Sequence, residues 1–143
     1  MTDLRQPRYC VANTLHRTAR AVSRIYSEEM RPCGIKRSQF ALLGNLNYLG
    51  VVQLSELATI MIIDRTTLSR NLKPLEKQGL IFINRSPKDA RVKELSLTRQ
   101  GKAKFNEALK LWHKAQARVL DKFGDTNWQA LESTLVELRE KLN

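Results

Sequence analysis

The sequence predicts a mainly helical α+β fold. Apolar residues recur at three- and four-residue spacing through most of the chain, as they do along one face of an amphipathic helix. One stretch differs, because the β-rich runs 80–83 and 92–97 flank a turn-forming cluster at residues 86–89 and predict a β-hairpin. With 143 residues, no internal repeat and no linker-like stretch, the chain fits a single domain.

Three helices are expected in the first part of the chain. Residues 9–30 form the first, with apolar side chains on one face and arginines on the other. Ser38 is expected to be the N-cap of the second helix, which Gly50 ends. Residues 54–63 are apolar nearly all round, so we expect the third helix to be buried.

A fourth helix follows in the stretch DRTTLSRNLKPLEKQGL, residues 64–80. Asp64 is expected to cap its start and Gly79 to end it. An inward apolar stripe consists of Leu68, Leu72 and Leu75. The polar side chains left pointing outward near its start are Arg65, Thr66, Thr67, Ser69, Arg70 and Lys73. Pro74 lies too deep for a first-turn proline, so a kink is expected there at a local cost of about 3 kcal/mol.

Two helices are expected after the hairpin. Thr98 can cap a long helix that ends at Gly124, and Thr126 with Gln129 forms a capping box for the last one. The last helix carries a narrow apolar seam made of Trp128, Leu131, Leu135, Leu138 and Leu142. Such a seam predicts packing against another helix.

Positive charge dominates the chain. The formal net charge is +11 and the pI is about 10.1, which favours a polyanionic partner over an enzyme acting on acidic substrates. Residues 64–104 carry 11 cations against 4 anions, whereas residues 105–143 carry 6 of each. The charge excess therefore lies on the first and middle segments, and the last third of the chain is neutral.

The order helix, tight turn, helix and basic hairpin is that of a winged helix-turn-helix, in which the second helix enters the DNA major groove. Hydroxyls can bond base edges or phosphates, and an arginine can bind guanine bidentately with about 1–3 kcal/mol of discrimination. The cations of the hairpin are Arg85, Lys88, Arg91 and Lys93. Asp89 is placed to orient a neighbouring guanidinium. A solvated charged face would explain the helix alone equally well, but helix and hairpin together favour contact with DNA or RNA.

Five stretches of distinctive sequence are spread over most of residues 10–105: GIKRSQFALL, LSELA, DRTTLSRNLKPLEKQGLI, KDAR and LSLTRQGK. Together they closely resemble the MarR family of bacterial transcription regulators. The family pattern includes a D-x-R in the wing and an L-T-x-x-G that opens the next helix. Ile62 departs from the pattern, because the family commonly has glycine in the turn between the two helices.

The resemblance implies a homodimer. Residues 36–98 would form the winged helix-turn-helix, and residues 9–31 and 99–143 would form the dimerisation helices, with the seam of the last helix among them. Carried over by motif, Arg91 would enter the minor groove and Asp89 would brace the wing. The residues that would face the major groove are Asp64, Thr66, Thr67 and Arg70. Ser38 would meet a phosphate.

Two cysteines and two histidines are the remaining candidates for chemistry. Some members of the family sense oxidants through a cysteine of the first helix, and others bind phenolic carboxylates, so Cys10 and Cys33 are candidate redox sensors. We favour the alternative that both thiols are small apolar packing groups. His16 and His113 show no ligand spacing with each other or with the cysteines, so no metal site is expected.

Together these features predict a sequence-specific regulator of transcription that binds double-stranded DNA at a pseudo-palindromic operator. It would most simply be a repressor, released by a small phenolic ligand or by an oxidant. The alternative is an architectural protein that binds DNA regardless of sequence. Without a glycine-rich phosphate loop or a nucleophile motif, neither an enzyme nor a cofactor is expected. No apolar run reaches the length of about 18 residues that spans a bilayer and no signal peptide is visible, so we expect a cytoplasmic protein without membrane contact.

Overall fold

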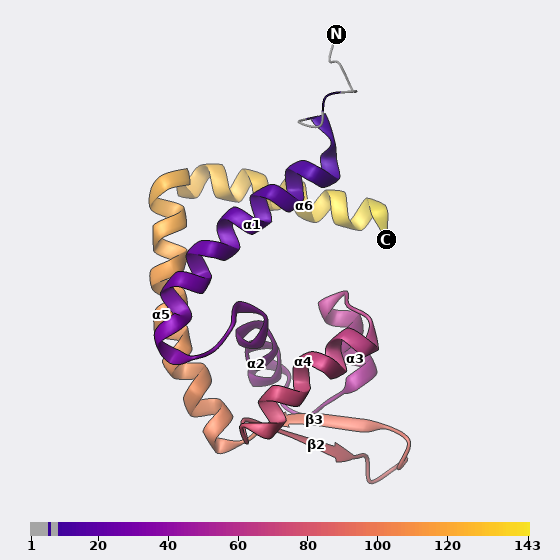
Figure 1. Cartoon of the computed structure of the whole chain (residues 1–143). Coiled ribbons are helices and arrows are strands. Elements are labelled where there is room, and N and C mark those ends of the chain that lie inside the picture. Colours follow the sequence, from indigo (N-terminus) through magenta and orange to yellow (C-terminus); the bar gives the residue numbers. More distant parts are fainter. Residues whose placement is uncertain (1–5, 7–8) are drawn as a thin grey trace. The chain divides into compact units, whose positions relative to one another are not determined.

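The structure, a computed structural model, describes residue 6 and residues 9–143. Its elements in chain order are α1 (Val11–Met30), the 3₁₀ helix η2 (Arg31–Cys33), α2 (Arg37–Leu49), β1 (Val52–Gln53), α3 (Leu54–Met61), α4 (Arg65–Lys77), β2 (Ile81–Arg85), β3 (Lys93–Leu97), α5 (Arg99–Phe123) and α6 (Asp125–Leu142) (Figure 1). The predicted mainly helical α+β fold with one hairpin is therefore confirmed.

The chain forms two compact units. Residues 30–111 make one, called the lobe below, and the described residues up to 29 together with residues 112–143 make the other, called the helical unit. The lobe contains every strand of the described chain and helices α2, α3 and α4. No helix in the described part of the chain combines the length and apolar character needed to cross a bilayer.

The lobe is built on a three-stranded antiparallel sheet with the order β1-β3-β2. Leu95 of β3 lies at its centre, paired with Val52 on one side and Ile83 on the other. Helices α2, α3 and α4 pack against this sheet and lie on the same side of β2 and β3 in Figure 1. Side chains with less than 2% exposure include Leu42, Leu43, Leu46, Leu57, Leu68, Leu72, Leu75 and Leu95. Burying each such leucine contributes on the order of 2 kcal/mol.

A close junction joins the end of α4 to the start of α5. The Thr98 N–H donates to the Leu80 carbonyl at 3.1 Å, and the Thr98 hydroxyl donates to the Gly79 carbonyl at 2.6 Å. The same hydroxyl oxygen accepts from the Gly101 N–H at 2.9 Å, so Thr98 is the N-cap of α5, as predicted. A Cβ atom at Gly101 would lie 1.8 Å from the Leu80 carbonyl oxygen. Only glycine therefore fits at the last position of the L-T-x-x-G motif.

Two predicted helix starts are wrong. Ser38 is the second residue of α2, and the N-cap is Lys36, whose N–H donates to Gln39 Oε1 at 2.9 Å. The side chain of Gln39 satisfies the helix start, which leaves no capping role for the serine. Thr126 lies inside the first turn of α6, whose N-cap is Gly124 at φ 90°, so the predicted capping box does not form. The glycine takes a conformation that L residues avoid, and this sets where α6 begins.

The third helix is shorter and more exposed than predicted. It ends at Met61, and its buried residues are Leu57 and Ala58, whereas Ile60 is 45% exposed. Ile62 follows in the left-handed region at φ 54° and ψ 48°, and it is the one described residue other than glycine with a positive φ. The turn therefore has the left-handed backbone that a glycine would normally adopt, although the residue is isoleucine.

The helical unit is held together by polar and aromatic contacts between α1 and the second half of α5. Arg118 pairs with Glu29 at 2.7 Å and with Glu28 at 3.4 Å. The Tyr26 hydroxyl donates to Gln116 Oε1, and the Tyr26 ring lies 6.2 Å from the Trp112 ring, centroid to centroid. These contacts fix α1 against α5 within the unit.

The apolar seam of α6 is incompletely covered. Its first four members, Trp128, Leu131, Leu135 and Leu138, are half-buried, and Leu142 is 76% exposed. Apolar side chains of α1 are exposed in the same unit, among them Val11 and Leu15. The helical unit therefore presents apolar surface that its own chain does not bury.

We expect Gly101→Ala to destabilise the lobe by about 3 kcal/mol or more, since the added methyl group would overlap backbone rather than a flexible side chain. Urea denaturation followed by circular dichroism measures this loss. Gly44→Ala is the matched control, because a Cβ there would lie an ordinary 3.4 Å from Phe105. Equal stability of the two variants would contradict the close approach of α5 to Leu80.

Candidate nucleic-acid interface

The start of α4 is capped by Asp64, as predicted. Asp64 Oδ1 accepts from the Thr67 N–H at 2.8 Å, and Oδ2 accepts from the Thr67 hydroxyl at 2.6 Å. The hydrogen bonds from the Thr67 hydroxyl and N–H lower the pKa of Asp64 below its ordinary value, so the carboxylate is charged at neutral pH. The Thr67 proton is thereby committed to Asp64, and its hydroxyl oxygen can only accept from a further partner.

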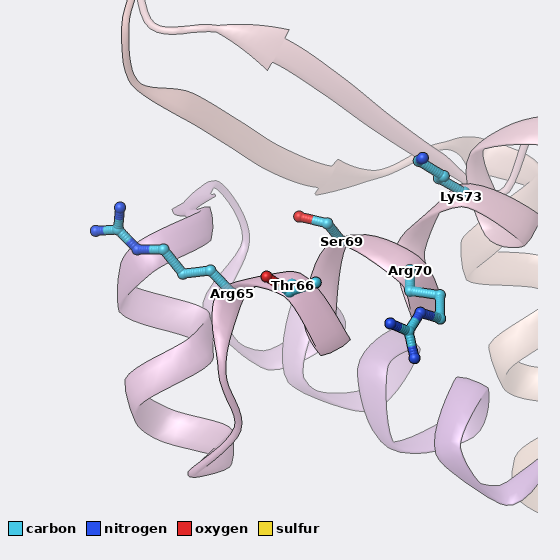
Figure 2. Close-up of a pocket in the computed structure, with 5 residues that line it drawn as sticks. All are labelled: Arg65, Thr66, Ser69, Arg70 and Lys73. Atoms are coloured by element: carbon cyan, nitrogen blue, oxygen red, sulfur yellow. The ribbon is translucent and has the colours of Figure 1, made fainter.

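The outward face of α4 carries the predicted polar side chains. Five of them line an open pocket of about 340 Å³: Arg65, Thr66, Ser69, Arg70 and Lys73 (Figure 2). Figure 2 shows Arg70 and Lys73 leaving α4 in opposite directions, with Ser69 on the side of Lys73. Thr67 is outside this set and half-buried, since it serves the cap. The face therefore presents three cations and two hydroxyls to whatever lies against it.

The opposite face of α4 anchors the helix. Leu68, Leu72 and Leu75 are each 0% exposed, which confirms the predicted inward stripe. The helix continues through Pro74 to Lys77, although proline has no N–H to donate. All five pocket residues lie before the proline, so the part of the helix that precedes Pro74 carries them.

The hairpin is a basic wing with an ordered tip. Arg91 donates to Asp89 Oδ1 from its backbone N–H at 3.0 Å and from Nε at 3.2 Å, and Nη2 donates to Oδ2 at 3.2 Å. The hydrogen bonds from Arg91 lower the pKa of Asp89. The Arg91 side chain is nonetheless 91% exposed. Asp89 thus orients the guanidinium, as the sequence predicted, and leaves it accessible.

The remaining wing residues lie where the two strands meet the tip. Arg85 and Lys93 are paired across the hairpin at the ends of β2 and β3, and both are exposed. The Ser86 N–H donates to the Val92 carbonyl at 2.8 Å and closes the hairpin, and the Ser86 hydroxyl accepts from the Lys88 N–H at 3.3 Å. Ser86 is 7% exposed. The sequence indicated a turn at Ser86 but not that its side chain would be buried to support the tip.

Two further cations belong to the exposed surface of the lobe. Lys36 and Arg37 stand beside Ser38 at the start of α2, and all three side chains are exposed. Of these three residues, only Ser38 was expected at the interface from the sequence. The excess of positive charge in residues 1–38 was the signal that could have found the other two.

The cysteines have different environments. Cys10 is exposed, and its Sγ accepts from the Asn13 N–H at 3.5 Å at the start of α1. Cys33 is 5% exposed, and its thiol donates to the Met30 carbonyl at 3.0 Å. Within the described residues, no group of three or more histidine, cysteine or acidic side chains could hold a metal ion. The buried position of Cys33 suits a packing group, and Cys10 keeps an accessible thiol.

Stability should depend on pH through the Asp64 cap. The folded pKa of Asp64 is lowered, so its stabilisation is present in full above the unfolded value of about 3.9 and is lost as pH falls through the folded pKa. We expect the difference in unfolding free energy between the wild type and Asp64→Ala to be constant above about pH 5 and to shrink below about pH 4. Urea titrations across this range measure it. Asp64→Asn is the control, because an amide can cap without titrating. A difference between the wild type and Asp64→Ala that does not change with pH would contradict the charged cap.

Comparison with known proteins places this interface in a family. The family model of the MarR family matches residues 35–93. The chain is 32% identical to the M. tuberculosis transcriptional regulator MOSR, solved in complex with DNA, with a TM-score of 0.83 over 93% of this chain and 96% of that one. It is 27% identical to the transcriptional repressor CouR bound to a 23-mer DNA duplex, with a TM-score of 0.86 over 97% of this chain and 99% of that one. The transcriptional repressor MdtR of Bacillus subtilis is 34% identical over 82 residues, which are 57% of this chain and 53% of MdtR. The resemblance seen in the sequence is thereby confirmed, and the chain belongs to the MarR family of winged helix-turn-helix transcriptional regulators.

Proposed function

We propose that the protein is a sequence-specific regulator of transcription that binds double-stranded DNA as a homodimer at a pseudo-palindromic operator, most simply as a repressor. The observation that carries this proposal is the polar face of α4, where three cations and two hydroxyls line one pocket beside a self-capped helix start. MOSR and CouR, which were solved on DNA, resemble the chain over nearly its whole length. Together these findings support α4 as the recognition helix.

The side chains of α4 support reading of bases as well as binding of phosphates. Arg65 and Arg70 offer planar donors that match the two acceptors of guanine, and Thr66 and Ser69 can donate or accept. Lys73 is a point charge suited to a phosphate. Such a mixture suits a helix that lies between two phosphate backbones and reaches the base edges between them.

Arg91 supports a second contact, in the minor groove next to the major groove that α4 would occupy. Its guanidinium is already held by two hydrogen bonds to Asp89, so little side-chain entropy remains to be lost on binding. A narrow minor groove concentrates negative potential and attracts an inserted arginine. The wing would therefore add affinity and a preference for groove width.

The exposed apolar surface of the helical unit supports the homodimer. The seam from Trp128 to Leu142 is only partly covered within one chain, and Val11 and Leu15 are exposed. A second copy could bury them, and two-fold symmetry would then present two wings and two α4 helices. Half-sites about one helical turn, roughly 10 bp, apart would match this arrangement.

Release from DNA by a small phenolic ligand or by thiol oxidation is a finer part of the proposal. The exposed thiol of Cys10 supports oxidation at that position, whereas the buried Cys33 does not. Peroxide should release the wild type from its operator but not Cys10→Ser, as measured by fluorescence anisotropy. Equal release of both proteins, or release of neither, would exclude Cys10 as a sensor.

The central test is selection of genomic fragments by the purified protein at near-physiological salt, followed by sequencing of the retained DNA. We expect an enriched inverted repeat. Uniform retention would overturn the proposal and favour an architectural protein whose positive charge supplies affinity for any duplex.

Variants of the arginines sharpen this test. Arg70→Ala should reduce affinity for the selected site about tenfold or more and flatten the preference between this site and a scrambled duplex. Arg17→Ala removes an exposed arginine from α1 in the helical unit and is the matched control, since it should leave the preference unchanged. If Arg70→Ala weakened all sequences alike, α4 would bind phosphates without reading bases.

A further inference from the structure

The turn between α3 and α4 holds an isoleucine in a strained conformation. Ile62 lies at φ 54° and ψ 48°, where a branched Cβ crowds its own backbone. Its N–H is bonded to the carbonyls of Ala58 and Thr59, so the conformation is part of the helix end and not a loose loop. Glycine would form the same turn without the strain.

The side chain of Ile62 gains little compensating burial. It is 60% exposed, and Ile60 one residue before the end of α3 is also 45% exposed. The strain destabilises the free protein, and a side chain that stays largely in water contributes little burial energy to offset it. A partner that buries the side chain would account for an isoleucine at this position.

The place of Ile62 in the chain, next to the start of α4, favours DNA as that partner. It lies two residues before the cap Asp64 and three before Arg65, so its Cα lies within about 11 Å of the Arg65 Cα by chain length alone. The N-terminal residues of a recognition helix are those that reach base edges. The apolar group exposed on base edges in the major groove is the C5-methyl of thymine.

We propose that Ile62 is a specificity-determining residue that packs its side chain against a thymine methyl group beside the bases read by α4. This inference rests on the proposed function. The strain of the turn is retained because the branched side chain reaches the methyl group, which a glycine could not. The contact adds a preference for thymine at one position of each half-site.

The experiment compares Ile62→Gly with the wild type on the selected operator and on probes in which one thymine at a time is replaced by deoxyuridine at the same position of both half-sites. Deoxyuridine pairs as thymidine does and lacks only the methyl group. Thermal unfolding of the free proteins is measured in parallel. Val51→Ala is the matched control, since Val51 is a 67% exposed apolar residue of the same lobe outside the α3–α4 turn.

We expect Ile62→Gly to raise the Tm by about 2–4 °C, because the strain is relieved. The same variant should bind the operator at least about fivefold more weakly, which is the effect of losing roughly one methyl-sized apolar contact in each half-site. Deoxyuridine at one position should weaken operator binding by the wild type by a similar factor. It should not change the affinity of Ile62→Gly, because that variant has already lost the contact. Val51→Ala should match the wild type on every probe.

Two results would overturn this inference. One is an Ile62→Gly protein that is more stable and binds the thymine operator as tightly as the wild type. The other is a loss of affinity that persists unchanged on every deoxyuridine probe. Either result leaves the proposed function intact, because the proposed function is tested separately, by whether the wild type selects an inverted repeat.

Discussion

The carbonyl group of Leu80 is the point on which the arrangement of the lobe depends. It accepts from the Thr98 N–H, and the absence of a side chain at Gly101 lets the first turn of α5 come down onto it. Leu80 lies directly before β2, and its own N–H donates to the Leu75 carbonyl at the end of α4. The outward face of α4 and the base of the wing are therefore fixed to one small group of backbone atoms. A displacement of these atoms would move both at once.

The start of α4 and the tip of the wing are ordered by the same local arrangement. In each, an aspartate accepts from a backbone N–H two or three residues ahead and also from the side chain of that residue, Thr67 for Asp64 and Arg91 for Asp89. One carboxylate thus orders both the backbone and a side chain, and the hydrogen bonds that hold it keep it charged. The helix start and the wing are therefore ordered in the free protein. Binding then costs less conformational entropy than it would if these segments were flexible.

Much of this arrangement could be predicted from the sequence. The leucine stripe of α4 predicted which of its side chains face outward. The β-rich runs on either side of the turn residues predicted where the basic tip of the hairpin lies. Family membership confirms the expectation of a DNA-binding regulator instead of an enzyme. The wrong positions were Ser38 and Thr126, where several residues could cap a helix and the choice depends on local competition that a single sequence does not reveal. The exposure of α3 was missed because an apolar pattern does not show whether the chain itself covers it.

The tip of the wing has an evolutionary consequence. The hydrogen bond from the Ser86 N–H to the Val92 carbonyl closes the hairpin below it, and hydrogen bonds of residues 87–91 run to Ser86, to Val92 and among themselves. The tip is therefore a nearly self-contained module on a fixed base. Its length and charge can change by mutation while the sheet and the helices of the lobe keep their packing. Descendants of one ancestral regulator could in this way diverge in the DNA flanks they prefer while sharing an unaltered fold.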